Sequence, residues 1–332
     1  MRPRIVLGFS GGVDSAVTAK LLTLSGWEVH CVYLETGSGE GEFARESAEK
    51  MGLPFDMIDA RSDLEREVCA PFAAAYLAGA TPSPCVLCNR RVKLKLLCEA
   101  ADGLGIDHIA TGHYAAARAG ALFRGRAEND QSYMLCLVKS EEARRLVLPL
   151  GGYVKRDVRA FAGRFGLAQA QKPDSMEICF IPDGDFAAWI ERRGGAPGEG
   201  ALIYNGERVG THGGCHRYTL GQRRGLGFAA GRRVFVSEIR PETNEVVLSD
   251  GDGLYMDRIR TGEANWLISP PRYEFRCDVR VRHSRTLDAA TARAMSDGTL
   301  DITFDKPVRA PCPGQAAALY AGGRLIAGGM IK

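Results

Sequence analysis

The hexapeptide SGGVDS at residues 10–15 constrains the fold of this chain more than any other segment. It follows a strand-like apolar run at residues 5–9 and precedes a helical pattern of apolar residues that stops at Gly26. Two adjacent glycines allow a tight turn, so that successive backbone N–H groups and a helix N-terminus face one concavity. This concavity suits a pyrophosphate, and Asp14 could hold a metal ion or orient a phosphate. The alternative is an ordinary glycine turn capped by serine or aspartate.

The segments that follow repeat a strand–helix alternation. We expect strands at residues 28–34, 55–59 and 107–110, and helices at residues 43–51 and 94–104. This alternation predicts an α/β fold with a doubly wound, mostly parallel sheet that carries helices on both faces. Because ligands of such sheets bind at the carboxyl ends of the strands, SGGVDS, Leu34 and Gly112 should lie near one another.

The pattern changes after the glycine-rich segment at residues 194–198. Short β-rich runs appear at residues 201–204, 233–239 and 245–248, and longer runs follow from residue 257. Turn signals at residues 313–314 and 322–323 separate the last of these runs, which favours a small antiparallel barrel. We therefore expect a catalytic domain at residues 1–190, a small central β-rich domain at residues 191–253 and a C-terminal β-barrel at residues 254–332.

Length and charge agree with several domains and a polyanionic partner. The 332 residues exceed one average domain. Residues 1–80 hold 7 basic and 12 acidic residues, whereas residues 81–332 hold 36 and 28. The basic remainder suits a nucleic acid, and an ordinary solvated surface is the alternative. No apolar run approaches the roughly 18 residues of a membrane helix, and the N-terminus lacks a signal-peptide pattern. We expect a cytoplasmic protein without membrane association.

Two of the ten cysteines stand out. The chain has no secretory pattern, so its cysteines should be reduced, and most of them are expected in the core. Cys85 and Cys88 differ because they form the sequence CVLC, flanked by prolines and then by basic residues. Arg90 and Arg91 in that basic run could favour a reactive thiolate and hold nucleic-acid phosphate. A solvated helix face is the alternative.

The loop and further motifs resemble a known family. SGGVDS matches the loop of the PP-loop ATP pyrophosphatases, which split ATP into AMP and pyrophosphate and adenylate a carbonyl-type oxygen; it lacks the Gly-Lys-Ser/Thr of a P-loop. Five further motifs follow in order: TPSPCVLCNRRVK at 81–93, ATGHY at 110–114, DQSY at 130–133, DSMEICFI at 174–181 and GQRRGLG at 221–227. Together they closely resemble the bacterial tRNA-specific 2-thiouridylases, which thiolate the wobble uridine of certain tRNAs.

This resemblance covers nearly the whole chain and implies a function. It implies an ATP-pyrophosphatase domain, a small central domain and a tRNA-contacting C-terminal β-barrel. ATP and Mg²⁺ are the implied cofactors, tRNA and a sulfur-carrier or persulfide-donor protein the implied partners, and a monomer is expected. Two alternatives are an amide-forming ligase with the same loop, which has no use for Cys88 and Cys179, and a non-enzymatic RNA-binding module.

Site residues carry over from the resemblance by position. The catalytic residues would be Cys88 as nucleophile, Cys179 as the acceptor of persulfide sulfur, and Asp14. The ATP site would comprise Gly8, Phe9, Ser10, Gly11, Gly12, Val13, Asp14, Ser15, Leu34 and Gly112. The tRNA contacts, to which the basic run is added, would be Ser83, Pro84, Cys85, Arg90, Arg91, Asn129, Asp130, Gln131, Arg282 and His283.

Two sulfur chemistries fit the same cysteines. In a persulfide route, Cys179 carries the sulfur, Cys88 attacks its inner sulfur, and a Cys88–Cys179 disulfide remains. In a cluster route, Cys85, Cys88 and Cys179 ligate three irons of a 4Fe–4S cluster whose fourth iron holds sulfide. Cys85 slightly favours the cluster, because the persulfide route leaves this residue without a task.

Overall fold

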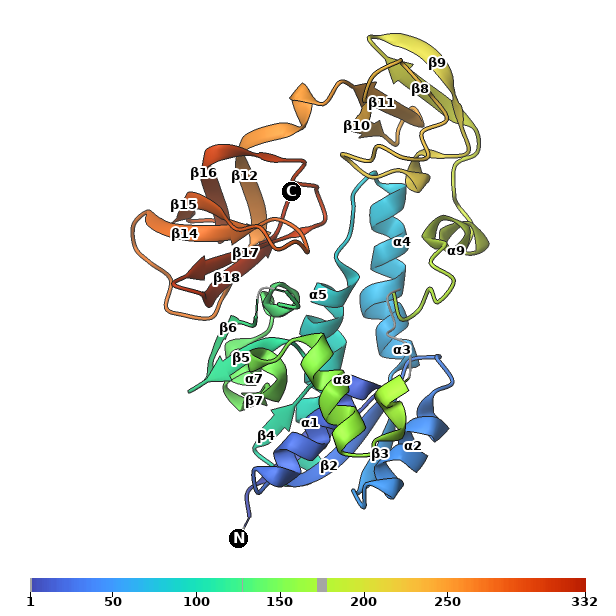
Figure 1. Ribbon diagram of the computed structural model, residues 1–332. Coiled ribbons are helices and arrows are strands. Elements are labelled where there is room, and N and C mark those ends of the chain that lie inside the picture. The colour runs from blue at the N-terminus through green and yellow to red at the C-terminus, as the bar shows by residue number, and fades with distance from the viewer. Residues whose placement is uncertain (1, 127, 172–177) are drawn as a thin grey trace.

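The computed structural model describes residues 2–126, 128–171 and 178–332. A parallel sheet with its helices forms one end of the molecule, a small β domain forms the other end, and a β-barrel lies beside the helices that join them (Figure 1). Among the helices of the described segments, none combines the length and the apolar character that a membrane crossing requires.

The N-terminal domain is built on a parallel sheet in the order β3-β2-β1-β4-β7. Its strands are β1 (Arg4–Gly8), β2 (Glu28–Glu35), β3 (Phe55–Asp59), β4 (His108–Ala110) and β7 (Leu146–Val147). The expected parallel α/β sheet is confirmed. The carboxyl ends of β1, β2 and β4 meet at one edge of the sheet.

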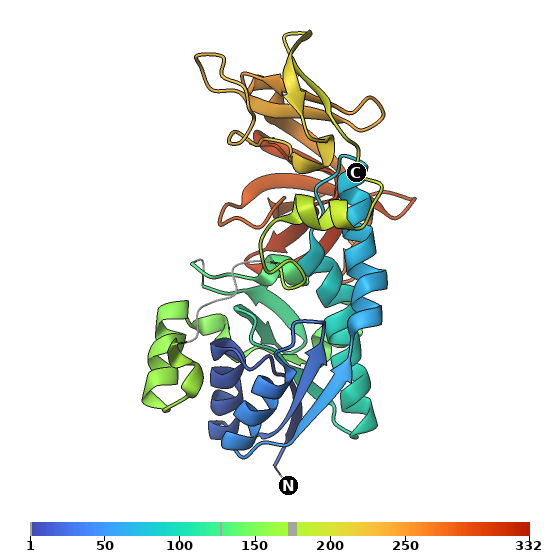
Figure 2. The ribbon, with the colours of Figure 1, turned by 90° about the vertical axis from the view of Figure 1, so that its right-hand side faces the viewer.

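Helices cover both faces of this sheet because successive side chains of a strand point in opposite directions. Ile5 and Leu7 pack with residues of α1 (Val13–Leu24) and α2 (Gly41–Lys50). Val6 packs on the other face with residues of α6 (Leu94–Gly103). Figure 2 shows α1 and α2, in blue, on the opposite side of the sheet from α6.

Two irregular helical segments lie between β3 and β4 in the chain. The first joins α3 (Arg61–Leu64) to α4 (Ala70–Leu77) through a π-helical stretch, Glu65–Cys69. The second joins α5 (Pro84–Cys88) to α6 through the π-helical stretch Asn89–Lys93. The helix expected to begin at residue 94 therefore begins ten residues earlier, at Pro84, whose fixed backbone angle suits a first helical turn. The domain also contains α7 (Ser140–Arg145) and α8 (Lys155–Arg164).

The small β domain follows α9 (Phe186–Arg192) and has the strand order β10-β11-β8-β9. Its strands are β8 (Gly200–Tyr204), β9 (Glu207–His212), β10 (Phe235–Arg240) and β11 (Glu245–Ser249). Sequence analysis overlooked β9, because its sequence ERVGTH contains a single large apolar residue.

The C-terminal barrel has the strand order β12-β16-β15-β14-β17-β18-β6-β5, and β13 also pairs with β18. Its own strands are β12 (Tyr255–Glu263), β13 (Asn265–Trp266), β14 (Phe275–Arg280), β15 (Asp288–Ala294), β16 (Thr299–Arg309), β17 (Ala316–Ala321) and β18 (Arg324–Met330). A bridge between Thr261 and Ile331 brings β12 back to the end of β18. The expected β-barrel is confirmed.

One hairpin of the N-terminal domain continues the barrel's sheet. It consists of β5 (Ala115–Arg118) and β6 (Ala121–Arg124), and Phe123 of β6 pairs with Arg324 of β18 (Figure 1). The division into residues 1–190, 191–253 and 254–332 stays a prediction, and this hairpin crosses it in space.

The barrel docks on the N-terminal domain through specific hydrogen bonds. The Tyr133 hydroxyl donates to the Ala316 carbonyl (3.0 Å) and accepts the Ala316 N–H (3.1 Å). The Gln315 amide donates to the carbonyls of Thr81 (3.0 Å) and Pro82 (3.1 Å), directly before the CVLC helix. The barrel is thereby fixed against the segment that carries the cysteines.

Glycine packing makes this docking testable. A Cβ added to Gly328 in β18 would lie 2.6 Å from the Cys136 carbonyl oxygen, whereas one added to Gly262 in β12 would meet nothing closer than 3.8 Å. We predict that Gly328→Ala destabilises the protein by about 1–3 kcal/mol, because overpacking forces the backbone to shift. Gly262→Ala is the matched control, and urea denaturation measures both. Equal denaturation midpoints for the two variants would contradict the described docking.

Candidate active site

The SGGVDS loop forms the turn that its glycines predict. It runs from the end of β1 to α1, whose N-cap residue is Gly12 and whose first turn carries no side-chain cap. Gly11 has φ +70°, and an added Cβ would lie 3.0 Å from the Ala44 Cα, so glycine is required there. The Ser15 hydroxyl donates to the Gly12 carbonyl (3.0 Å) and lies 3.3 Å from the Ser10 hydroxyl. The first-turn N–H groups of α1 thus border a shaped loop, as an anion site requires.

Two residues of the expected ATP site are buried, and a third, Gly112, lies against the SGGVDS loop. Phe9 and Val13 are buried in the core, so contact of these residues with a nucleotide would involve their backbone. Gly112 lies against the loop, because an added Cβ would be 3.2 Å from the Asp14 Cβ. The structure therefore brings Gly112 and SGGVDS together, as the strand-end argument predicts.

Asp14 is held by two residues from distant parts of the chain. The Tyr114 hydroxyl donates to Asp14 Oδ1 (2.6 Å), and the Lys155 ammonium donates to Asp14 Oδ2 (2.6 Å). Lys155 reaches this position because α8 packs on α1 through Val158 and Ala162. Sequence analysis missed Lys155: it is the first residue of a helix, and no local pattern connects it with Asp14. A cation beside the loop suits a phosphate-binding site.

Leu34, Cys88 and Phe180 pack against one buried cluster. This cluster consists of Ala60, Leu64, Val68, Cys69, Val92 and Leu96. Leu34 comes from the strand next to β1, Cys88 ends α5, and Phe180 follows Cys179 directly. The cluster therefore links the sheet edge that carries the loop with Cys88 and with the neighbour of Cys179.

Cys179 lies at the surface in a turn, in which the Ile181 N–H donates to the Ile178 carbonyl (2.8 Å). Desolvation by the surrounding protein raises the pKa of its thiol to about 11; the thiols of Cys88 and Cys85 act in the same direction, and Lys93 opposes them. These groups therefore lie within electrostatic range of Cys179. Residues 174–177 of the DSMEICFI motif lie outside the described residues.

The three cysteines proposed as cluster ligands do not form a metal-binding group. Among the described residues, no set of three or more His, Cys, Asp or Glu side chains is arranged to hold a metal ion. Cys85 is exposed and Cys88 is half-buried. The arrangement of the thiols gives no support to the 4Fe–4S expectation.

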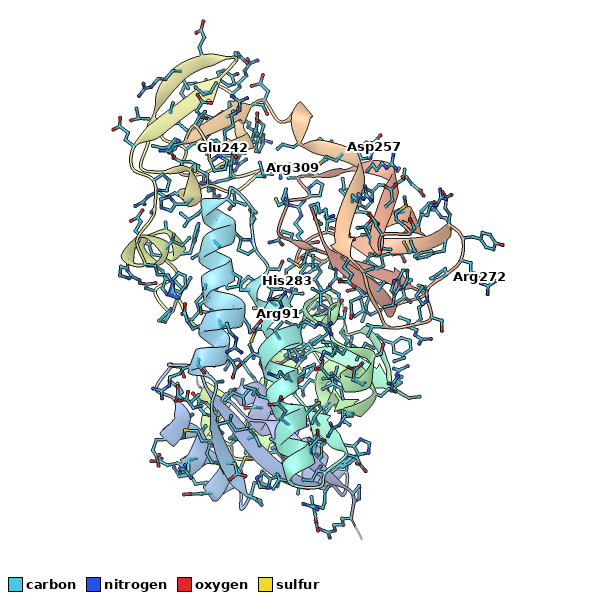
Figure 3. All side chains as sticks on the ribbon, turned by 180° about the vertical axis from the view of Figure 1, so that it is seen from behind. Arg91, Glu242, Asp257, Arg272, His283 and Arg309 are labelled. Atoms are coloured by element: carbon cyan, nitrogen blue, oxygen red, sulfur yellow. The ribbon has the colours of Figure 1, made fainter. Side chains whose placement is uncertain are left out.

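The expected tRNA contacts differ in solvent exposure, because some are buried, some half-buried and some exposed. Ser83 is buried beside the Tyr133 hydroxyl (3.4 Å), next to half-buried Pro84 at the start of α5. Arg91 is exposed and pairs with Glu67 (3.3 Å), whereas Arg90 is half-buried. Figure 3 shows Arg91 and His283 in the middle of the molecule and Arg272 at the outer end of the barrel. Arg282 is half-buried and donates to the Arg309 carbonyl, and His283 is exposed.

The 129–131 turn has a buried middle residue between two half-buried ones. The Asp130 carboxylate is buried and accepts hydrogen bonds from the N–H groups of Gly125 (2.9 Å) and Ser132 (3.0 Å) and from Arg280 Nη2 (2.9 Å). A carboxylate enclosed in this way cannot reach an RNA backbone. The Asp130 carboxylate thus has its partners inside the protein, and the tRNA contact expected of residues 129–131 stays a prediction.

The fold and this site define a nucleotide-binding α/β domain coupled to a pair of neighbouring cysteines and a β-barrel. Family models match as the tRNA methyl transferase HUP domain (residues 3–183), the tRNA methyl transferase PRC-barrel domain (190–250) and the aminomethyltransferase beta-barrel domain (256–331). The chain is 38% identical over 346 residues to the tRNA-specific 2-thiouridylase MnmA of Syntrophotalea carbinolica, with 98% of each chain covered. It is 37% identical over 359 residues to MnmA of Carboxydothermus hydrogenoformans, with 100% of this chain and 98% of that one covered.

These matches show that the chain belongs to the tRNA-specific 2-thiouridylase family. Among solved structures, a 4-thiouridine synthetase–RNA complex with bound ATP resembles 57% of this chain and 50% of its own, at 15% identity and a TM-score of 0.38. That likeness is too weak to support an inference.

The raised pKa of Cys179 predicts the pH dependence of its reactivity. Only the thiolate is alkylated, so below a pKa of about 11 the rate should rise about tenfold per pH unit between pH 7 and 9. Iodoacetamide labelling with peptide mass spectrometry measures this rate, and a free cysteine derivative, with a pKa of about 8.5, serves as the internal standard. If Cys179 levels off at the same pH as the standard, its thiol is not desolvated as described.

Proposed function

We propose that this protein thiolates C2 of the wobble uridine of tRNA and converts ATP into AMP and pyrophosphate in the same reaction. The observation that carries this proposal is the shared buried cluster, which joins the sheet edge of the SGGVDS loop to Cys88 and to the neighbour of Cys179. Family membership supports it, because the relatives that match along nearly the whole chain are named tRNA-specific 2-thiouridylases.

The nucleotide loop supplies the activation step. Oxide and hydroxide are poor leaving groups, so the O2 oxygen of uracil must first be adenylated, after which AMP can leave. First-turn N–H groups of α1 bind the phosphates of ATP, and Lys155 stabilises their negative charge from the other side of Asp14. The Asp14 carboxylate is the type of ligand that Mg²⁺ takes together with substrate phosphates, and the ion would neutralise phosphate charge.

Sulfur transfer then follows the persulfide route. The terminal sulfur of a Cys179 persulfide attacks C2 and displaces AMP, which leaves C2 joined to Cys179 through two sulfurs. The Cys88 thiolate attacks the Cys179 Sγ, the S–S bond breaks, and the outer sulfur stays on the uridine. The Cys88–Cys179 disulfide that forms is reduced by an external thiol. A persulfide-donor protein would reload Cys179, whose exposure in a surface turn permits access.

Basic and polar groups around the cysteines would bind tRNA. The proposed contacts are Arg90, Arg91, Arg282 and His283, of which Arg91 and His283 are exposed and the other two half-buried. Ser83 supports the adjoining segment from inside, through Tyr133. An amide-forming ligase with the same loop would leave the neighbouring cysteines without a role, so thiolation accounts for more of the site.

Product analysis tests the activation step. We predict AMP and pyrophosphate as products, and we predict that Asp14→Ala lowers AMP formation about a thousandfold or more, because the loop loses the group that Tyr114 and Lys155 orient. Asp56→Ala is the control, since Asp56 is an exposed carboxylate of the same sheet. Nucleotide chromatography measures both variants. Formation of ADP in place of AMP would refute the assignment.

Single cysteine substitutions test the sulfur route. We predict that Cys88→Ser and Cys179→Ser abolish thiolation, whereas Cys85→Ser keeps it within about threefold, because the persulfide route uses two thiols. Peptide mapping without reductant should reveal a Cys88–Cys179 disulfide after one turnover. If anaerobically purified protein contains iron, and Cys85→Ser loses both iron and activity, the cluster route is correct and the persulfide route is not.

A further inference from the structure

A buried histidine joins the small β domain to the helix that follows Cys179. The Nε2 atom of His216 lies 2.9 Å from Glu191 Oε1, and the His216 side chain is 0% exposed. Because an ionised carboxylate only accepts hydrogen bonds, Nε2 is the donor. His216 belongs to the short helix Cys215–Arg217 of the small β domain, and Glu191 lies near the end of α9 (Figure 1). The bond therefore anchors α9 to the small β domain.

Packing leaves the His216 ring little freedom to choose another partner. Gly214 has φ +122°, and a Cβ added to it would overlap the ring. Among the described residues, Nδ1 of His216 is buried without a hydrogen-bond partner, so the bond to Glu191 orients the ring. This bond lowers the pKa of Glu191, and Arg217, which pairs with the same carboxylate, acts in the same direction. The carboxylate therefore stays ionised near neutral pH.

The same helix, α9, packs against both chain neighbours of Cys179. The ring centres of Phe180 and Trp189 are 5.2 Å apart. Ile178 and Phe180 also pack on the apolar cluster that contains Ile190 of α9, which is 0% exposed. Because the residues on either side of Cys179 both rest on this cluster, a displacement of α9 would move the thiol.

We propose that His216 and Glu191 are positioning residues, through which the small β domain holds the Cys179 thiol within reach of Cys88. The contacts run from His216 to Glu191, along α9, and from its apolar side chains to the turn that carries Cys179. This inference rests on the proposed function, in which a Cys179 persulfide delivers sulfur and Cys88 completes the transfer. It gives the small β domain a role in sulfur transfer and none in adenylation.

Two rates separate the position of the Cys179 thiol from its exposure. A disulfide requires its two sulfurs to meet at about 2.05 Å in a defined dihedral geometry, so the rate of Cys88–Cys179 disulfide formation reports how the thiols are placed. Diamide is a suitable oxidant, because it takes up the two electrons and two protons that the thiols release. Alkylation of Cys179 by iodoacetamide depends on its own access and thiolate fraction and needs no second thiol.

The test compares His216→Ala and Glu191→Ala with wild type, without ATP or tRNA. We expect the disulfide to form about tenfold more slowly in both variants, because misplacements of about 1 Å have effects of that size or larger, while alkylation of Cys179 stays within about twofold. His216→Gln keeps a side-chain donor and Glu191→Gln keeps an acceptor, so both should restore most of the rate. Unchanged disulfide rates, an equal fall in alkylation, or no disulfide in wild type overturns the proposal.

A matched control separates this effect from general loosening of the small β domain. The Tyr204 hydroxyl donates to Asp250 Oδ1 (2.7 Å), and both residues belong to that domain. Tyr204→Phe removes this hydrogen bond and leaves the contact between His216 and Glu191 in place. We expect its disulfide rate to stay within about twofold of wild type. A fall equal to that of His216→Ala would overturn the proposal.

The full reaction distinguishes this inference from the proposed function. In a single turnover with ATP and tRNA, His216→Ala should release pyrophosphate at a rate within about twofold of wild type and form 2-thiouridine about tenfold more slowly. An equal loss in both steps would overturn the positioning role. If wild type formed no 2-thiouridine, the proposed function would fail, and the disulfide rates measured without tRNA would still decide what holds Cys179.

Discussion

The buried ion pair between Asp130 and Arg280 is the interaction on which the arrangement of this molecule depends. Both side chains are 1% exposed, and breaking such a pair by removing one partner costs about 3–5 kcal/mol, because the other charge stays buried. With the β6–β18 pairing and the hydrogen bonds of Gln315, the pair prevents the barrel from moving independently of the parallel sheet. The nucleotide loop, the CVLC helix and the barrel are thereby kept in fixed relation.

The candidate active site combines a polar region at the SGGVDS loop with an apolar region at the cysteines. At the loop, backbone N–H groups and Lys155 create a polar site around Asp14, suited to phosphate. At the cysteines, the buried cluster beneath Cys88 and Phe180 is apolar, and desolvation raises the pKa of Cys179. We propose that the polar site activates the uridine and that the neighbouring thiols deliver sulfur to it. Joining both sites through one cluster allows the two steps to act on the same base.

The sequence predicts what local patterns determine and misses what distant contacts determine. Short apolar runs that alternate with helical patterns predict β1, β2 and β3, and the glycines of SGGVDS predict the turn in which Gly11 has a positive φ. The hairpin β5–β6 continues the barrel's sheet next to β18, and no local pattern in its sequence predicts that partner. Lys155 meets Asp14 for a similar reason, through the packing of α8 on α1.

Asp130 shows that a sequence motif alone does not predict which partners a side chain contacts. Its position within DQSY identifies it as important, but its role follows from burial and from Arg280, which lies 150 residues away in the sequence. A motif records which residues are required, whereas solvent exposure decides whether a side chain can contact a macromolecule. The CVLC cysteines are similar: their spacing is compatible with metal ligation, but no metal-binding group forms among the described side chains.

Tracing the O2 oxygen of uridine tests the central claim most directly. The wobble uridine of a substrate tRNA is labelled at O2 with a heavy oxygen isotope, and the protein is supplied with unlabelled ATP, Mg²⁺ and a persulfide donor. If this oxygen is adenylated and then displaced by sulfur, the label appears in the phosphate of AMP, one atom for each 2-thiouridine formed. Thiolated tRNA accompanied by unlabelled AMP would show that the oxygen leaves by another path and that the uridine is not activated by adenylation at O2.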